Sequence, residues 1–122
     1  MLQPKALIIG LAFIAGFSVV PNAAFAAKQA PVVNVTATAD QTFSPNTVTL
    51  HRGKPVTLRF QSTGGVHGIT STDLGIPATM IMPNKPVSFA LTPRKTGTFV
   101  LPCTIVCGAH HADMHLTVEV KP

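Results

Sequence analysis

A short stretch near the C-terminus contains several side chains that could bind a metal. Both cysteines of the chain, Cys103 and Cys107, lie there with two of its five histidines, His110 and His111, and with Met114. Thiolate, imidazole and thioether together are typical of electron-transfer copper sites. A thiolate stabilises the oxidised metal and a thioether the reduced metal, so a set that contains both tolerates either oxidation state. The residue types therefore predict a copper site in this stretch.

Four other interpretations of the same residues remain open. Positions 103, 107, 111 and 114 are spaced like one face of a helix, although the β-branched residues after Cys103 and the glycine at position 108 disfavour one. The two cysteines could form a structural disulfide in an oxidising compartment. Zinc could bind two cysteines and two histidines, but Met114 would then have no role. A cysteine–histidine nucleophile pair lacks an orienting third residue other than Asp113.

Other histidines and methionines are given structural roles. His110 is predicted to face solvent, and so is His115, which is out of phase with the apolar residues that follow it. Met80 and Met82 flank an isoleucine before a proline turn. We predict that they fill the core or form a hydrophobic rim near the loops.

Alternating apolar and polar residues on both sides of the cysteine stretch predict strands. Apolar residues alternate with polar ones over 56–61, and again over 116–120 directly after the stretch. Similar runs, separated by turn residues, occur over residues 47–50, 66–72, 87–91 and 98–102. Short strands at this spacing, with no helical run between them, predict an all-β sandwich or barrel. The cysteine stretch would be a loop between two of these strands.

Length and composition exclude several classes of protein. The chain has 122 residues, 46% hydrophobic and 11% charged, which predicts one compact domain and not a disordered chain. Two cysteines are too few for a disulfide-dense mini-protein. The formal net charge is +5, but the basic residues lie singly except for Arg94-Lys95, with no interleaved aromatics. We therefore expect no nucleic-acid partner.

The first residues have the pattern of a secretory signal. Lys5 precedes an uncharged apolar run over residues 6–20, and Ala24-Phe25-Ala26 fits a small-residue cleavage site. Because the run is shorter than the roughly 20 residues that span a bilayer, we predict a signal peptide at residues 1–26 and a mature domain at residues 27–122. An uncleaved membrane anchor is the alternative. In both cases the domain is expected outside the cytoplasm, in the periplasm or secreted.

The cysteine stretch resembles the binuclear copper A motif of cytochrome c oxidase subunit II and of the nitrous oxide reductase C-terminal domain. The family pattern is Cys-x3-Cys-x3-His-x2-Met, and the matching residues are Cys103, Cys107, His111 and Met114. Gly108 stands where the family usually has glycine, and His67 supplies the upstream histidine that the pattern requires. The segment 43–56 also looks like a cupredoxin opening, so the resemblance covers about residues 43–120.

The resemblance implies a cupredoxin Greek-key sandwich with two copper ions bridged by both cysteine thiolates. The other ligands that it implies are His67, His111, Met114 as a weak axial ligand, and the backbone carbonyl of Ile105. Ile105 stands where the family often has glutamate. The carbonyl ligand does not depend on that side chain, but the oxidase-assembly role of the glutamate does. Asp73 and Asp113 lie close in the sequence to the implied ligands and could orient them, but a role at the site is not the favoured interpretation of either.

The resemblance also implies a carrier of single electrons that is not an enzyme on its own. Its expected partner is a redox protein, either a cytochrome or an oxidase component, and the domain is expected to be monomeric. Association with a membrane would come through that partner or through an uncleaved N-terminal segment. The chain has no Trp and only four acidic residues, so we expect a free or loosely associated protein rather than a complete oxidase subunit. The alternatives are an accessory electron-entry subunit of a terminal oxidase, a periplasmic copper chaperone, and a disulfide-bonded structural sandwich.

Overall fold

The computed structural model describes residues 29–122, together with the isolated positions 10, 12 and 16. Apart from these three positions, the predicted signal peptide at residues 1–26 and its boundary at Ala27 lie outside the described residues. The described residues contain no helix with the length and apolar character that crossing a membrane requires.

Nine strands and one short 3-10 helix make up the described part of the chain. The strands are β1 (Val32–Ala37), β2 (Phe43–Ser44), β3 (Thr47–His51), β4 (Val56–Ser62), β5 (His67–Ser71), β6 (Ile76–Ile81), β7 (Val87–Leu91), β8 (Gly97–Pro102) and β9 (His115–Lys121). The 3-10 helix η2 (His111–Asp113) lies between β8 and β9. The prediction of an all-β fold is confirmed.

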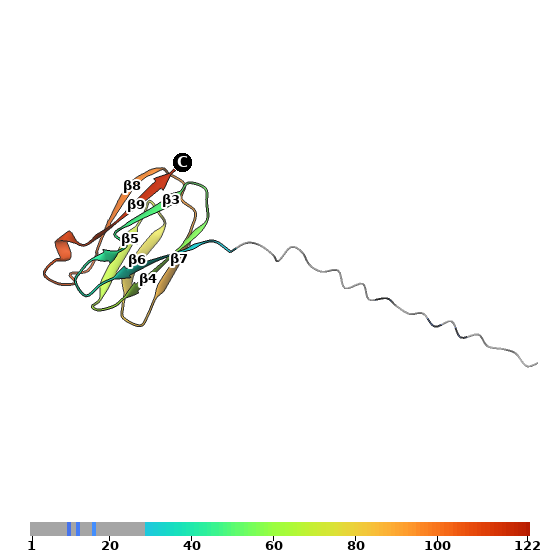
Figure 1. The fold of residues 1–122 in the computed structure, drawn as a ribbon, viewed down its shortest axis with the longest axis horizontal. Coiled ribbons are helices and arrows are strands. Elements are labelled where there is room, and N and C mark those ends of the chain that lie inside the picture. Colours follow the sequence, from blue (N-terminus) through green and yellow to red (C-terminus); the bar gives the residue numbers. More distant parts are fainter. Residues whose placement is uncertain (1–9, 11, 13–15, 17–28) are drawn as a thin grey trace, which may run out of the picture.

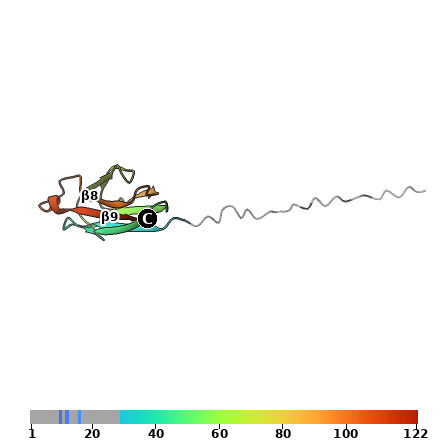
Figure 2. The ribbon, with the colours of Figure 1, turned by 90° about the horizontal axis from the view of Figure 1, so that it is seen from above.

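The strands form two sheets and a separate hairpin (Figure 1; Figure 2). One sheet has the order β2-β1-β4-β7 and the other the order β3-β9-β8, while β5 pairs only with β6. The pairs β1–β4 and β3–β9 are parallel, and the remaining pairs are antiparallel. Since the parallel neighbours are distant in sequence, the chain crosses between the sheets and closes a sandwich.

The core lies between the two sheets and contains the residues that the period-two pattern predicts. In β4 the side chains of Val56, Leu58 and Phe60 are buried, and those between them are partly exposed. In β9 every second residue from Leu116 to Val120 is buried in the same way. Both sets belong to one hydrophobic cluster, so the two sheets share a single core.

Three strands of the structure, β1, β2 and β6, are not among the six predicted runs. Strand β6 carries exposed residues at three of its six positions, Pro77 among them, so its sequence lacks a clean alternation. Proline is tolerated there because β6 has a partner on only one side, in the two-stranded β5–β6 hairpin.

The fold brings three strand ends together at one end of the sandwich. There β5 begins at His67, β8 ends at Pro102, and β9 begins at His115. The η2 segment projects at this end, opposite the end where the N-terminal part of the described chain enters the sandwich (Figure 1). The cysteine stretch therefore connects β8 to β9 at the tip of the molecule.

The core position of Leu58 gives a test of this architecture. Leu58 is fully buried in β4, between β1 and β7. We expect Leu58→Ala to lower the free energy of unfolding by about 2–5 kcal/mol, because it removes buried methyl groups and leaves a cavity. Urea denaturation followed by circular dichroism measures this change.

The matched control is Val100→Ala in β8, whose side chain is 60% exposed. It should cost less than about 1 kcal/mol, the range of strand propensity at exposed positions. Equal losses for the two variants would contradict the described core.

Candidate metal centre

The candidate ligands lie on the loop that joins β8 to β9, residues 103–114, called the ligand loop below. Its base is closed by a hydrogen bond of 2.9 Å from the backbone N–H of Cys103 to the carbonyl of Met114. Its only helical part is the three-residue turn η2. The interpretation of the stretch as one face of a helix is therefore wrong, because the spaced positions follow a folded loop.

A close backbone approach joins β5 to the ligand loop. The N–H of Thr104 donates a hydrogen bond of 3.2 Å to the carbonyl of Gly68, the residue after His67. A Cβ atom at Gly68 would overlap Thr104 Oγ1 and lie 2.9 Å from Ile105 Cγ1. Glycine at position 68 thus allows His67 to reach the loop.

The two thiols are adjacent but not bonded to each other. Cys103 Sγ lies 3.4 Å from Cys107 Sγ, much farther than the roughly 2.05 Å of a disulfide bond. Cys103 is buried within the hydrophobic core, and Cys107 is half-buried. Both cysteines are free thiols in the structure. Free cysteines are compatible with a metal site and do not fit the alternative of a structural disulfide.

The structure brings the other four predicted ligands to this thiol pair. Met114 Sδ lies 3.5 Å and His111 Nδ1 3.8 Å from Cys107 Sγ. The carbonyl oxygen of Ile105 lies 3.2 Å from Cys103 Sγ. A ring nitrogen of His67 and the two sulfur atoms all lie within 4.8 Å of one another. Six potential donors from two distant segments of the chain therefore surround one small volume.

His67 presents an unshared electron pair toward this volume. Its Nε2 lies 2.7 Å from the carbonyl oxygen of Gly64. Because a carbonyl only accepts, Nε2 carries the proton and Nδ1 is left unprotonated in the neutral ring. Nδ1 is buried and has no hydrogen-bond partner among the described residues. A buried acceptor without a partner is unusual, and a metal ion held with the thiols would satisfy it.

Burial affects the acidity of the site. Burial, followed by the hydrogen bond and charge of Cys103, raises the pKa of the Cys107 thiol from 9.0 to about 11. In the metal-free protein at neutral pH this cysteine is therefore a neutral thiol. Since only a thiolate binds copper or zinc, metal binding must release its proton.

Most of the predictions for neighbouring residues agree with the structure. His110 and His115 are exposed, as predicted. Met80 is 51% exposed and Met82 is half-buried, so they form a rim and not part of the buried core.

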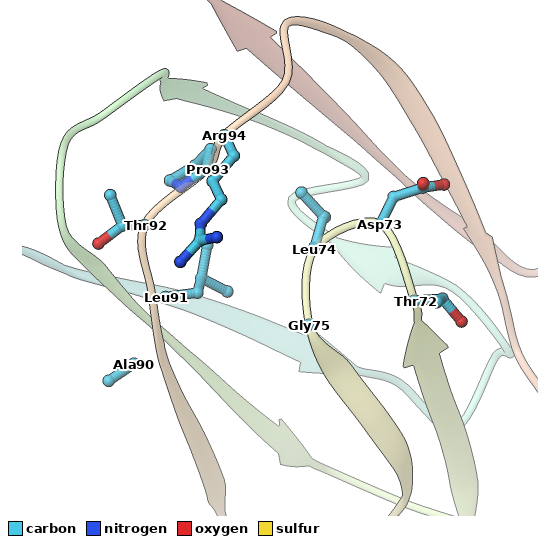
Figure 3. A pocket seen from close by; sticks show the side chains of 9 residues that line it. All are labelled: Thr72, Asp73, Leu74, Gly75, Ala90, Leu91, Thr92, Pro93 and Arg94. Atoms are coloured by element: carbon cyan, nitrogen blue, oxygen red, sulfur yellow. The ribbon is translucent and has the colours of Figure 1, made fainter.

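Asp73 lies away from the candidate ligands, so the structure does not support an orienting role for it. Strand β5 runs away from the site, and Asp73 lies in the turn beyond its far end. There it lines a cavity of about 380 Å³ together with Arg94, although its carboxylate points away from the guanidinium (Figure 3). No cysteine or histidine lines this cavity. The candidate metal site therefore lies at the ligand loop and the start of β5, not in this cavity.

Two residues of the site could not be identified by their own chemistry. Gly64 contributes only a carbonyl oxygen to His67, and Gly68 contributes only the absence of a side chain. The available signal for Gly68 is its place inside a strand, where glycine often marks a close approach of another backbone.

Comparisons with known proteins bear on the family and the fold of the chain. The family model of the cupredoxin-like domain matches residues 7–118. A comparison with curated protein sequences finds no match.

Solved structures with a similar fold include domains of oxidases and a blue copper protein. A chain of a heme-copper terminal oxidase dimer matches 75% of this chain with a TM-score of 0.65 and 18% identity, and the match spans 65% of that chain. The periplasmic domain of cytochrome oxidase subunit II from Bradyrhizobium japonicum matches 74% of this chain and 83% of its own, with a TM-score of 0.65 and 16% identity. Auracyanin A, a blue copper protein from Chloroflexus aurantiacus, matches 75% of this chain and 99% of its own, with a TM-score of 0.56 and 16% identity. These similarities are to the fold.

The approach of β5 to the ligand loop predicts a sensitive position. Gly68→Ala should push Thr104 and Ile105 away from β5 and separate His67 from the thiols. We expect the variant to bind metal on the order of tenfold more weakly or worse, as for loss of other groups that orient ligands. Competition titration against a chelator of known affinity measures this.

The double variant Gly68→Ala/Thr104→Ala serves as the comparison. It removes the hydroxyl that the new methyl group would overlap, so it should bind metal more tightly than Gly68→Ala alone. Wild-type affinity in the single variant would contradict the described approach.

The acidity of Cys107 gives a pH prediction for the reduced, metal-free protein. Its raised pKa means that the folded protein binds this proton more tightly than the unfolded chain does. That stabilisation is complete below pH 9.0 and is lost as the pH rises toward 11. The free energy of unfolding, measured in urea at a series of pH values, should therefore fall over this interval. Cys107→Ser should flatten this part of the profile, and an identical slope in the variant would refute the assignment.

Proposed function

The chain belongs to the cupredoxin-like domain family, and on this basis we propose that it is a copper protein that transfers single electrons through a binuclear copper A centre. The proposed ligands are His67, Cys103, Ile105 through its carbonyl, Cys107, His111 and Met114. The proposed domain is residues 27–122, exported to an extracytoplasmic compartment by residues 1–26.

The observation that supports this proposal most is the distribution of the donor atoms, some of which lie beside Cys103 and others beside Cys107. His111 and Met114 lie next to Cys107, and the carbonyl of Ile105 lies next to Cys103. His67 is close to both sulfur atoms. Two thiolates shared between two ions, each with one imidazole and one weak ligand, would use all six donors. Copper when bound supplies the one-electron redox couple.

The protein part of the proposed centre keeps the ligands in place and keeps water away. His67 and Met114 are each 1% exposed, and Cys103 lies in the hydrophobic core. Packed side chains in a core change position little. A change of one charge would therefore occur without large movement of the ligands.

The half-buried His111 gives the proposed centre its contact with a partner. Val106 of the same loop is 82% exposed, and Met80 and Val66 beside β5 are also exposed. An apolar surface of this kind suits a brief encounter with another redox protein. We propose that such a partner, a cytochrome or an oxidase component, exchanges electrons near His111.

A mononuclear blue copper site is the second candidate. Its support is the similarity in fold to auracyanin A, a blue copper protein. One thiolate with His67, His111 and Met114 would complete a set of that type. The two candidates differ in whether the second cysteine is needed.

Copper reconstitution of the reduced protein tests the proposal. We expect two copper ions per chain, a purple colour and an EPR spectrum whose hyperfine splitting comes from one electron shared by both nuclei. His67→Ala should lose this spectrum because it removes a ligand of one ion. His115→Ala is the matched control, since His115 is exposed and its ring bonds, among the described residues, to the carbonyl of Asp113 alone.

The cysteine variants separate the candidates. For a binuclear centre, Cys103→Ser and Cys107→Ser should each abolish the shared-electron spectrum. A single ion with a blue spectrum that survives one of these changes would establish the mononuclear site instead. Colourless binding of Cu(I) without a reversible redox couple would favour the copper chaperone.

A further inference from the structure

A glutamine far from the ligand loop in sequence holds the backbone of that loop. Gln41 lies in the turn between β1 and β2, and its Oε1 accepts a hydrogen bond of 2.6 Å from the backbone N–H of His110. The two residues are 69 positions apart. His110 directly precedes His111 and is the first flanking residue of η2, where no side chain of the loop itself caps the turn.

The turn that carries Gln41 is closed by several hydrogen bonds. The N–H of Thr38 donates to the carbonyl of Thr42 (2.9 Å), and the N–H of Gln41 donates to the carbonyl of Thr38 (3.1 Å). The hydroxyl groups of Thr38 and Thr42 lie 2.8 Å apart. Gln41 itself has a φ of 59°, a left-handed conformation that is uncommon for a residue with a side chain. The hydrogen-bonded turn therefore holds Gln41 in an uncommon backbone conformation, with its side chain against the ligand loop.

The loop has a matching feature on its side. A Cβ atom at Gly108 would lie 2.5 Å from Gln41 Cδ and 2.7 Å from its Oε1. The glutamine amide thus rests directly on the backbone of Gly108, one residue after Cys107. Any side chain at position 108 would displace it.

Little else fixes this half of the loop. None of the residues 108–113 is buried. Their other hydrogen bonds within the described part of the chain stay inside the loop or reach its neighbour His115. The Gln41 contact is therefore the polar link between this segment and the distant β1–β2 turn.

We propose that Gln41 is a positioning residue of the metal centre: its amide holds the backbone at His110 and Gly108 and thereby fixes His111 relative to Cys107. This inference rests on the proposed function for its copper measurements, while the contact itself is independent of any metal.

Three substitutions of Gln41 distinguish the effect of losing its side-chain contact from an effect on the backbone conformation of the β1–β2 turn. Gln41→Gly removes the side chain and suits the positive φ, so it should leave the turn intact. Gln41→Asn also tolerates this conformation but is one methylene too short to reach His110. Gln41→Glu keeps both the length and an acceptor oxygen. The matched control is Gln61→Ala in β4, whose amide bonds to Thr36 and Arg59.

The first measurement is amide hydrogen exchange of His110, followed by NMR in the reduced, metal-free full-length protein. Gln41→Gly and Gln41→Asn should each speed exchange on the order of fivefold, the effect of one hydrogen bond. Gln41→Glu and Gln61→Ala should exchange at the wild-type rate. Wild-type protection in Gln41→Gly would overturn the proposal whether or not the protein binds copper.

The second measurement uses the copper-loaded protein. Gln41→Gly and Gln41→Asn should change the copper hyperfine splitting and release copper to a chelator about tenfold faster. Gln41→Glu should restore both properties. Faster exchange at His110 with unaltered spectra and copper release would overturn the positioning role and leave only a structural contact. Wild-type protein that takes up no copper would instead refute the proposed function, and the exchange experiment would still decide the contact.

Discussion

The arrangement of the candidate metal centre depends on the close approach of β5 to the ligand loop, where the carbonyl of Gly68 accepts a hydrogen bond from the N–H of Thr104. His67 begins a hairpin that belongs to neither large sheet, whereas the cysteines follow the edge strand β8. Packing of both around one core brings the segments together, and the missing side chain at Gly68 sets how closely they approach. The distances among the donors follow from this approach.

The burial that gathers the donors has an energetic cost in the metal-free protein. The Nδ1 atom of His67 is buried without a hydrogen bond from the described residues, which costs about 1–3 kcal/mol for a neutral acceptor. The Cys107 thiol has no such cost in the metal-free protein, because its raised pKa keeps it neutral at neutral pH. The fold thus leaves one donor unsatisfied, which a bound ion would relieve, and holds one proton that the ion must displace.

The sequence predicted most of the strands, since one-sided burial makes β4 and β9 alternate strictly in polarity. It also predicted the six residues that the structure gathers, because their types and spacing match a known pattern. It did not predict β1, β2 or β6, and in β6 the exposed residues and Pro77 break the alternation. Asp73 is near His67 in the sequence but not at the site, since nearness in sequence does not show which way a strand runs. Gly68 and Gln41 act through contacts between distant segments, which single-residue chemistry does not reveal.

The ligand loop starts and ends at neighbouring positions of an antiparallel pair, because Cys103 and Met114 close its base with a backbone hydrogen bond. Changes in the length or residues of the loop therefore leave the strand register of the sandwich unaltered. Outside the loop, the proposed site depends on few residues, among them His67, Gly68 and Gln41. Such a loop can change during evolution while the sandwich is kept. One scaffold can then acquire different metal chemistry mainly through changes in the ligand loop. The shared fold of an oxidase subunit domain and a blue copper protein fits this history.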